Sequence, residues 1–193
     1  MDVEAIWMPT YTGKRVDLLR PKPEQIDPED LAEHLSKEQR WVGACRGFLS
    51  VAQHAVMVAG ICADPLAGLL HDAHEAYTGD LPRPVKHLMY REVHNLEVRL
   101  DDAICLRFGL PAGAFRTPDV READERVAAT EMLHLVEPTA VWMPSFAEPL
   151  AIEHFTLWAP IYAKTRFLSM LRVLLENAGR PELFGAPPAR SVA

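Results

Sequence analysis

Cysteine is scarce in this chain of 193 residues: it has three, far apart in the sequence. An odd and scattered set fits neither a disulfide framework nor a CxxC metal site, so we expect reduced thiols in a cytoplasmic protein. Long apolar runs are missing as well. None reaches the roughly 18 residues that a membrane-spanning helix requires, and the first residues lack the basic-then-apolar order of a signal peptide. We therefore expect no membrane partner.

Basic residues are outnumbered, with 20 Lys and Arg against 27 Asp and Glu and a formal net charge of −7. A protein that coats nucleic acid needs a broad basic face, so this balance argues against a nucleic-acid partner. The apolar fraction of 49% and the charged fraction of 24% are ordinary for a globular protein. The length suits one domain over residues 1–193, with its core at about 30–178.

Strand-like alternation is confined to residues 7–19, where the sequence Tyr-Thr-Gly-Lys at 11–14 predicts the turn of a short hairpin. Elsewhere apolar residues recur at helical spacing, with capping residues before them and glycine after them. The expected helices run from Pro28 to about Leu35, Ser50 to about Ala63, Asp64 to about Thr78, Val85 to Phe108, Thr117 to about Val136 and Ala159 to Ala178. Residues 81–84 are expected to form a stiff loop. The pattern predicts an all-α bundle of five to seven helices behind a short irregular N-terminal segment.

Two adjacent potential metal ligands, His71 and Asp72, lie within the apolar stretch 67–75. A charged Asp there costs free energy unless it is paired, and a divalent cation would pair it. His54 and Asp124, on neighbouring predicted helices, can complete a set that suits Mn, Fe, Co, Ni or Zn and leaves positions open for water and a phosphate oxygen. Spacing alone also fits histidines in an ordinary core and an aspartate on a solvated helix face.

Glu75 follows His71 by four residues and therefore lies on the same side of the expected helix. A carboxylate beside the metal can take a proton from the attacking water or give one to the leaving alkoxide. His74 is open to two interpretations, a ligand to a second metal or a supporting or surface group. The bases around this motif favour a small anionic ligand, with Lys86 expected to contact it and Arg83 expected in a solvated loop.

The stretch Leu70–Lys86, LHDAHEAYTGDLPRPVK, closely resembles the bacterial 5′-deoxynucleotidase branch of the HD-domain metal-dependent phosphohydrolases. Val51–His54 is similar to the first-His motif of that branch, and Val120–Asp124 to its last-Asp motif. The resemblance implies an HD-domain helical bundle and one divalent transition metal. The implied metal ligands are His54, His71, Asp72 and Asp124.

The resemblance also implies roles for neighbouring residues. Asp72 and Glu75 would be catalytic, with Glu75 as the acid/base. Asp80 would contact the 3′-hydroxyl of the sugar, and Lys86 would contact the substrate. Arg40 would grip phosphate with its fork of donors, and Trp41 would pack against sugar or base.

Three functions follow as expectations. The first is hydrolysis of 2′-deoxynucleoside 5′-monophosphates to deoxynucleoside and phosphate. Residues 11–32 are also similar to phage-encoded HD dNTP triphosphohydrolases, so release of triphosphate from a dNTP such as dATP is the alternative. The third is a nucleotide sensor with a retired active site, against which an intact Glu75 argues. We also expect a homo-oligomer, because four C-terminal aromatic residues suit either a core or a dimer contact: Trp142, Phe146, Phe155 and Trp158.

Overall fold

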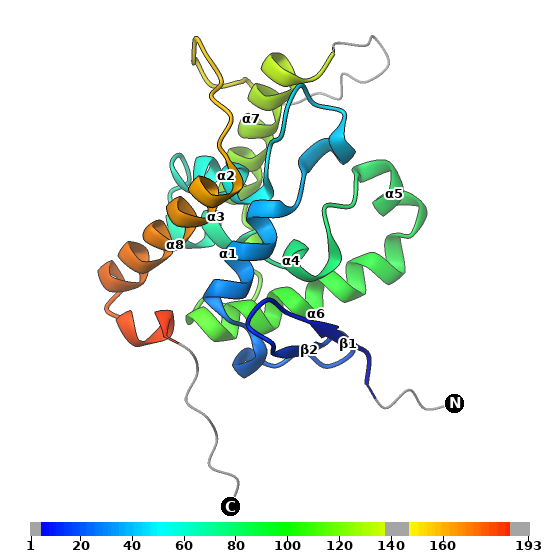
Figure 1. The fold of residues 1–193 in the computed structure, drawn as a ribbon, viewed down its shortest axis with the longest axis vertical. Coiled ribbons are helices and arrows are strands. Elements are labelled where there is room, and N and C mark those ends of the chain that lie inside the picture. The colour runs from blue at the N-terminus through cyan, green and yellow to red at the C-terminus, as the bar shows by residue number, and fades with distance from the viewer. Residues whose placement is uncertain (1–4, 138–146, 186–193) are drawn as a thin grey trace, which may run out of the picture.

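The computed structural model describes residues 5–137 and 147–185, and these are mostly helical (Figure 1). The helices are α1 (Pro28–Lys37), α2 (Val51–Ala59), α3 (Pro65–Leu70), α4 (Glu75–Thr78), α5 (Arg83–Leu88), α6 (Tyr90–Phe108), α7 (Pro118–Leu135) and α8 (Pro160–Asn177). Short 3-10 turns cover 23–25, 40–43, 114–116 and 181–184. The expected all-α class is confirmed.

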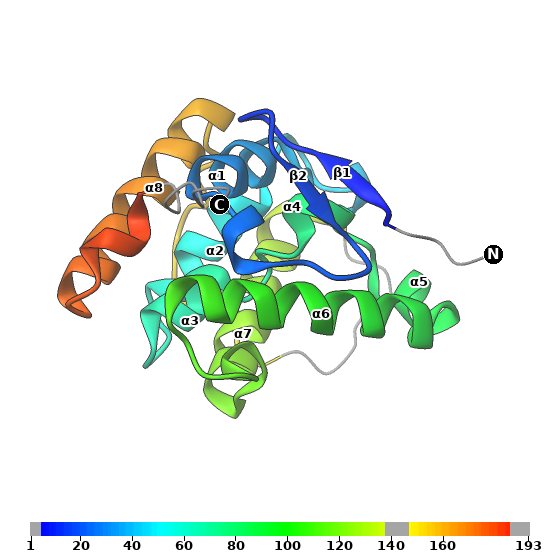
Figure 2. The same cartoon turned by 90° about the horizontal axis from the view of Figure 1, so that it is seen from below.

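The predicted N-terminal hairpin is present. Strand β1 (Trp7–Pro9) pairs antiparallel with β2 (Arg15–Asp17), with Met8 opposite Val16. Its turn is fastened to the start of α1, because the backbone N and Oγ1 of Thr12 donate to the two carboxylate oxygens of Asp30 at 2.6 and 2.9 Å. The hairpin therefore covers one side of α1 and α4, above the long helix α6 (Figure 2).

Helix α2 occupies the centre of the bundle, where it packs against α1, α3, α7 and α8. Figure 1 shows α8 and α5 on opposite sides of the molecule. The side chains that fill the core are completely buried and almost all aliphatic, among them Leu31, Leu35, Val51, Val58, Leu69, Leu70, Leu100, Ile104, Phe108, Val127, Phe167 and Leu171. Burial of each such side chain contributes about 1.5–3 kcal/mol, so the buried central helix is a rigid support for any polar group it carries.

The predicted helix starts are confirmed by their caps. Ser50 Oγ accepts from the Gln53 backbone N at 3.1 Å at the start of α2. Thr117 Oγ1 accepts from the Val120 N at 3.3 Å at the start of α7. Such caps satisfy backbone donors that have no partner inside the helix, which is why they mark helix starts in a sequence.

Two predicted helices are broken, and the prediction of continuous helices there was wrong. Over 64–78 the chain leaves α3 at Leu70 and tightens through 71–74 before α4 begins. The ring Nδ1 of His71 lies 2.8 Å from the carbonyl oxygen of Gly68, so a side chain competes with the backbone for that acceptor. Over 83–108 the chain is interrupted at Met89, and the expected stiff loop contributes its Pro84 to the first turn of α5.

The aromatic residues singled out in the C-terminal half divide into two groups. Trp142 and Phe146 lie outside the described residues. Phe155 packs on a small cluster that includes Leu49 and Leu135, and Trp158 packs on the main core. Among the residues that the structure describes, no helix combines the length and apolar character needed to cross a bilayer.

Candidate metal centre

The four predicted metal ligands come together from three segments. His54 lies in the middle of α2, His71 and Asp72 lie in the tight connection between α3 and α4, and Asp124 lies on α7. His54 Nε2 is 3.2 Å from Asp124 Oδ1 and 3.7 Å from Asp72 Oδ2. His71 Nε2 is 3.1 Å from Asp72 Oδ2 and 3.9 Å from Asp124 Oδ1. The spacing places two nitrogens and two carboxylates around one point.

Both histidines direct their Nε2 to that point. A carbonyl oxygen only accepts, so the contact with Gly68 puts the His71 proton on Nδ1 and leaves a lone pair on Nε2. His54 Nδ1 lies 2.7 Å from the carboxylate of Glu131, which favours the same tautomer. Among the described residues neither buried Nε2 makes a well-directed hydrogen bond, although His54 Nε2 lies 3.2 Å from Asp124 and His71 Nε2 lies 3.1 Å from Asp72. A buried polar group without a partner costs about 1–3 kcal/mol, and a divalent cation with nitrogen and oxygen ligands would satisfy both.

The electrostatics of the centre also favour a cation. Burial opposes charge on Asp72, but His71, with His54 and Arg40, outweighs it and holds the pKa of Asp72 well below its usual range. Burial likewise opposes ionisation of Asp124, and the hydrogen bond and charge of His54 lower its pKa. Two ionised carboxylates close together in a buried site repel each other, so a cation between them would be stabilised.

In the absence of a metal, a proton on His54 provides part of that charge. Burial and the nearby Arg40 disfavour the protonated ring, but Glu131 and Asp124 prevail and raise the pKa of His54 to about 9. A divalent cation at the same point would compete with this proton, because a histidine ligand must be unprotonated at the coordinating nitrogen.

Glu131 is a residue of the site that the sequence reasoning missed. It is fully buried on α7, seven residues after Asp124 and so two helical turns along the same face. Besides its contact with His54, its Oε2 accepts from Arg40 Nε and from Trp41 Nε1, both at 3.0 Å. A carboxylate behind a ligating histidine fixes the orientation of the ring and raises its basicity. The spacing of seven from Asp124 was the available signal.

Arg40 and Trp41 reach Glu131 through an unusual backbone. Trp41 and Val42 have left-handed φ angles of 60° and 52°, and Gly43 follows with 77°. This turn lets two consecutive side chains approach one carboxylate, at a cost of about 1–3 kcal/mol for each strained residue. Arg40 is buried and also places Nη1 3.6 Å from Asp72 Oδ2. Arg40 and Trp41 were expected to contact substrate. In the structure Arg40 Nε and Trp41 Nε1 donate instead to Glu131, which contacts the predicted ligand His54.

Glu75 lies beside the ligands with 3% of its surface exposed. Burial is the main cause that raises its pKa well above the usual range, with the charges of Asp72 and Asp80 acting in the same direction against His74 and Lys86. Lys86 Nζ is 3.5 Å from Glu75 Oε1 and 2.9 Å from Glu97 Oε1, and Glu75 Oε2 has no hydrogen-bond partner among the described residues. The site therefore holds a carboxyl group whose environment favours the protonated form.

Asp80 follows Gly79, whose backbone (φ 74°, ψ 164°) is accessible in practice only to glycine. The Asp80 backbone N donates to Glu38 Oε1 at 3.1 Å, which holds the turn. The charge of its carboxylate contributes to the raised pKa values of Arg40 and Glu75.

Of the two basic residues of α5, Arg83 is solvent-exposed as expected, whereas Lys86, expected to contact substrate, is directed at carboxylates of the protein. The Lys86 ammonium is enclosed between carboxylates, with 29% of its side chain exposed. Arg83 has 57% of its side chain exposed and places Nη2 3.9 Å from Asp124 Oδ2. Arg83 therefore lies at the rim of the centre, where an incoming anion would meet it first.

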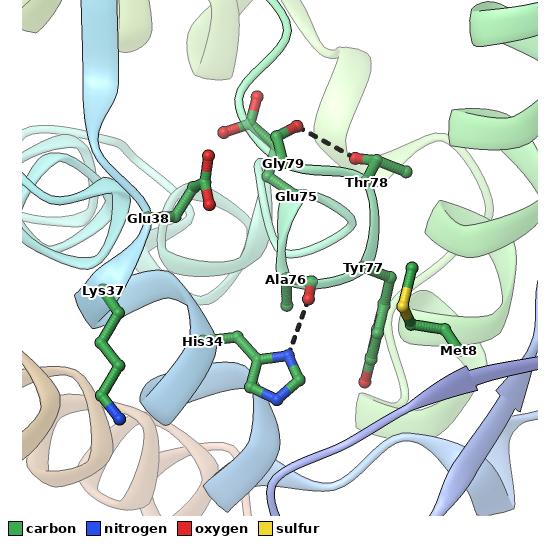
Figure 3. Close-up of a pocket in the computed structure, with 9 residues that line it drawn as sticks. All are labelled: Met8, His34, Lys37, Glu38, Glu75, Ala76, Tyr77, Thr78 and Gly79. Carbon is green, nitrogen blue, oxygen red and sulfur yellow. Dashed lines mark hydrogen bonds between the residues drawn. The ribbon is translucent and has the colours of Figure 1, made fainter. Parts of the chain in front are cut away.

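A pocket of about 420 Å³ opens beside Glu75, between the end of α1 and α4. Figure 3 shows Glu75 and Glu38 at one end of it, with His34 and Tyr77 at the other. The His34 ring is held by its Nδ1, 2.8 Å from the Ala76 carbonyl oxygen. A small ligand in this pocket would lie next to the carboxyl group of Glu75.

Comparison with known proteins finds relatives of the chain, but no protein-family model matches it. It is 41% identical over 117 residues to an uncharacterized protein of Rhodobacter capsulatus, a match that covers 55% of this chain and 60%, less than two thirds, of that protein. It is 33% identical over 171 residues to the uncharacterized protein YfdR of Escherichia coli K12, covering 86% of this chain and 94% of that protein. The chain belongs to the same family as YfdR.

Proposed function

We propose that this protein is an HD-type metal-dependent phosphohydrolase that cleaves 2′-deoxynucleotides at the α-phosphate, releasing phosphate from deoxynucleoside 5′-monophosphates. The observation that carries the proposal is the convergence of the buried Nε2 atoms of His54 and His71 with the carboxylates of Asp72 and Asp124. One divalent ion, Mn, Co, Ni, Fe or Zn, would be held by His54, His71, Asp72 and Asp124. Such an ion polarises a phosphoryl group and lowers the pKa of water.

Glu75 supplies the proton that the reaction needs. When water attacks phosphorus and the bond from phosphorus to the 5′-oxygen breaks, the leaving oxygen must gain a proton. The pKa of Glu75 is raised well above its usual range, which favours the protonated carboxyl group that can donate. The resulting carboxylate, 3.5 Å from the Lys86 ammonium, is stabilised until it takes a proton back from water.

The arrangement of basic groups favours a monophosphate over a triphosphate. Lys86 is engaged by Glu75 and Glu97, and Arg40 by Glu131. Arg83 at the rim is the basic group closest to solvent at the ligands. A triphosphate carries more negative charge beyond the α-phosphorus and would need further cations there. In this proposal the Asp80 carboxylate accepts a hydrogen bond from the 3′-hydroxyl of the sugar.

The proposal is tested with a panel of nucleotides and the full-length protein in the presence of Mn²⁺ or Co²⁺. Deoxynucleoside monophosphates should release inorganic phosphate, and ribonucleotides should be poorer substrates. Asp72→Asn, which keeps the shape but removes a charged ligand, is the matched control and should be inactive. Release of triphosphate from a dNTP in place of phosphate from a monophosphate would replace the substrate assignment. Nucleotide binding without turnover in the metal-loaded protein would replace the enzyme by a sensor.

A further inference from the structure

His74 repeats the arrangement found at His54. Its Nδ1 lies 2.9 Å from Asp101 Oδ1, and Asp101 is in turn held by Arg116 at 2.8 Å. This contact fixes the ring so that Nε2 points away from Asp101 and toward Glu97 Oε1, 3.6 Å away. Burial disfavours the protonated ring, but Asp101 and Glu97 prevail and raise the pKa of His74 to about 10, so a cation at Nε2 has to displace a proton. The residue is 5% exposed, and its Nε2 has no hydrogen-bond partner in the described part of the chain. His74 is not one of the four proposed ligands of the first centre, so its oriented Nε2 has no role there.

Carboxylate oxygens surround that nitrogen. Asp72, His74 and Glu75 can each offer a ligand atom within 4.8 Å of the other two. Glu75 contributes a second buried atom without a partner, its Oε2. Glu97 Oε1, from α6, lies 3.6 Å from His74 Nε2. Two unpartnered buried ligand atoms facing shared acidic groups fit a cation better than a neutral molecule.

We propose that His74, Glu75 and Asp72 form a second, weaker binding site for a divalent cation, which shares Asp72 with the centre at His54. The binding site rests on the proposed function only through the shared aspartate, and its effect on catalysis rests also on the proposed role of Glu75. It assigns to His74 the role of a ligand, which distinguishes it from a histidine that merely packs in the core.

Lys86 makes the second site weak. Its ammonium group lies among the same acids, 2.9 Å from Glu97 and 3.5 Å from Glu75, and supplies one positive charge there. Because 29% of the side chain is exposed, the ammonium can swing into solvent when a divalent ion replaces it. The second cation must displace this charge, so it binds only after the first site is full.

Occupation of the second site has a consequence for catalysis. A cation bound through Glu75 occupies the oxygen that exchanges the proton in the proposed reaction. Activity should therefore rise as the first equivalent of metal binds and fall as the second binds. The acid/base carboxyl thus becomes a point at which excess metal inhibits the protein.

The test is a titration of the metal-free full-length protein with Mn²⁺, with free Mn²⁺ followed by its electron paramagnetic resonance signal. The parent should bind one tight and one weaker equivalent, and the two bound ions should be magnetically coupled because they share a carboxylate. His74→Asn keeps a donor toward Asp101 and should lose the weaker equivalent alone. His87→Asn, an exposed histidine on α5, is the matched control and should keep both.

A substitution of Lys86 should have the opposite effect on metal affinity at the second site. Lys86→Gln removes the competing ammonium and should tighten the weaker site by about tenfold or more, since charges at this distance interact strongly away from bulk water. Lys86→Arg keeps the charge and should stay near the parent. A purely structural role for Lys86 would not tighten metal binding.

The outcomes separate the second site from the first. A single equivalent in the parent, or a weaker equivalent that survives in His74→Asn, overturns the second site and leaves the first intact. Absence of tightening in Lys86→Gln removes the competition argument and with it the proposal. A protein that binds no Mn²⁺ at all refutes the metal centre of the proposed function itself.

Discussion

Glu131→Gln is the substitution that probes the support of the centre most sharply. The carboxylate accepts from three donors, with His54 on one oxygen and Arg40 and Trp41 on the other. An amide of the same shape has one acceptor and one donor end. If its oxygen meets Arg40 and Trp41, its NH₂ faces His54 and forces the imidazole proton onto Nε2, toward the metal. If it is reversed, the NH₂ opposes two N–H donors.

Either orientation weakens the centre by an amount that can be worked out. Loss of a carboxylate behind a ligating histidine costs about 10- to 100-fold in metal affinity, or about 1.4–2.8 kcal/mol. The metal-free chain should also lose about 1–3 kcal/mol of unfolding free energy, because a buried donor is left without an acceptor. The assays are competition with a chromogenic chelator and urea unfolding. Glu122→Gln, on the exposed face of α7, is the control. Parental metal affinity in Glu131→Gln would refute the reasoning.

Three further predictions address the chemistry. Glu75→Gln should keep the tight metal equivalent but turn over about 100-fold more slowly or worse; loss of that equivalent would make Glu75 one of its ligands. Asp80→Ala should raise KM for deoxynucleotides and weaken the preference for deoxyribose over ribose. That preference should be about 5- to 150-fold in the parent, because an unpaired buried hydroxyl costs about 1–3 kcal/mol. Equal rates on both sugars in the parent would refute sugar selection by Asp80. Since the pKa of His54 is raised to about 9, metal must displace its proton below that pH, and the apparent affinity should fall about tenfold per unit of acidification; an affinity that is flat between about pH 6.5 and 8.5 would contradict this.

The helix starts could be predicted because their causes are local. Ser50 and Thr117 each accept from a backbone donor three residues away, so the capping residue can be recognised in the sequence. The hairpin at 7–19 was predictable for the same reason. The helix break at His71 could not be predicted. It depends on the contact of the His71 ring nitrogen with the carbonyl oxygen of Gly68, which the spacing of residues in the sequence does not indicate.

The predicted metal ligands could likewise be identified from the sequence, whereas the residues that support them could not. His54, His71, Asp72 and Asp124 are brought together as expected, since their motif spacing reflects one shared point. The role of Glu131 required the packing of α7 on α2, and no local rule signals the left-handed backbone that directs Arg40 and Trp41 toward it. Those contacts are made across 90 residues or more of chain.

The central claim is that a bound metal turns this protein into a phosphohydrolase, and removal and return of the metal tests it most directly. The protein is stripped with a chelator and assayed for phosphate release from deoxynucleoside monophosphates, with bound metal measured in the same samples. We predict no activity without metal and recovery in proportion to Mn²⁺ up to one equivalent, and neither in Asp72→Asn. Full phosphate release by metal-free protein, or none from any deoxynucleotide by metal-loaded protein, would contradict the account.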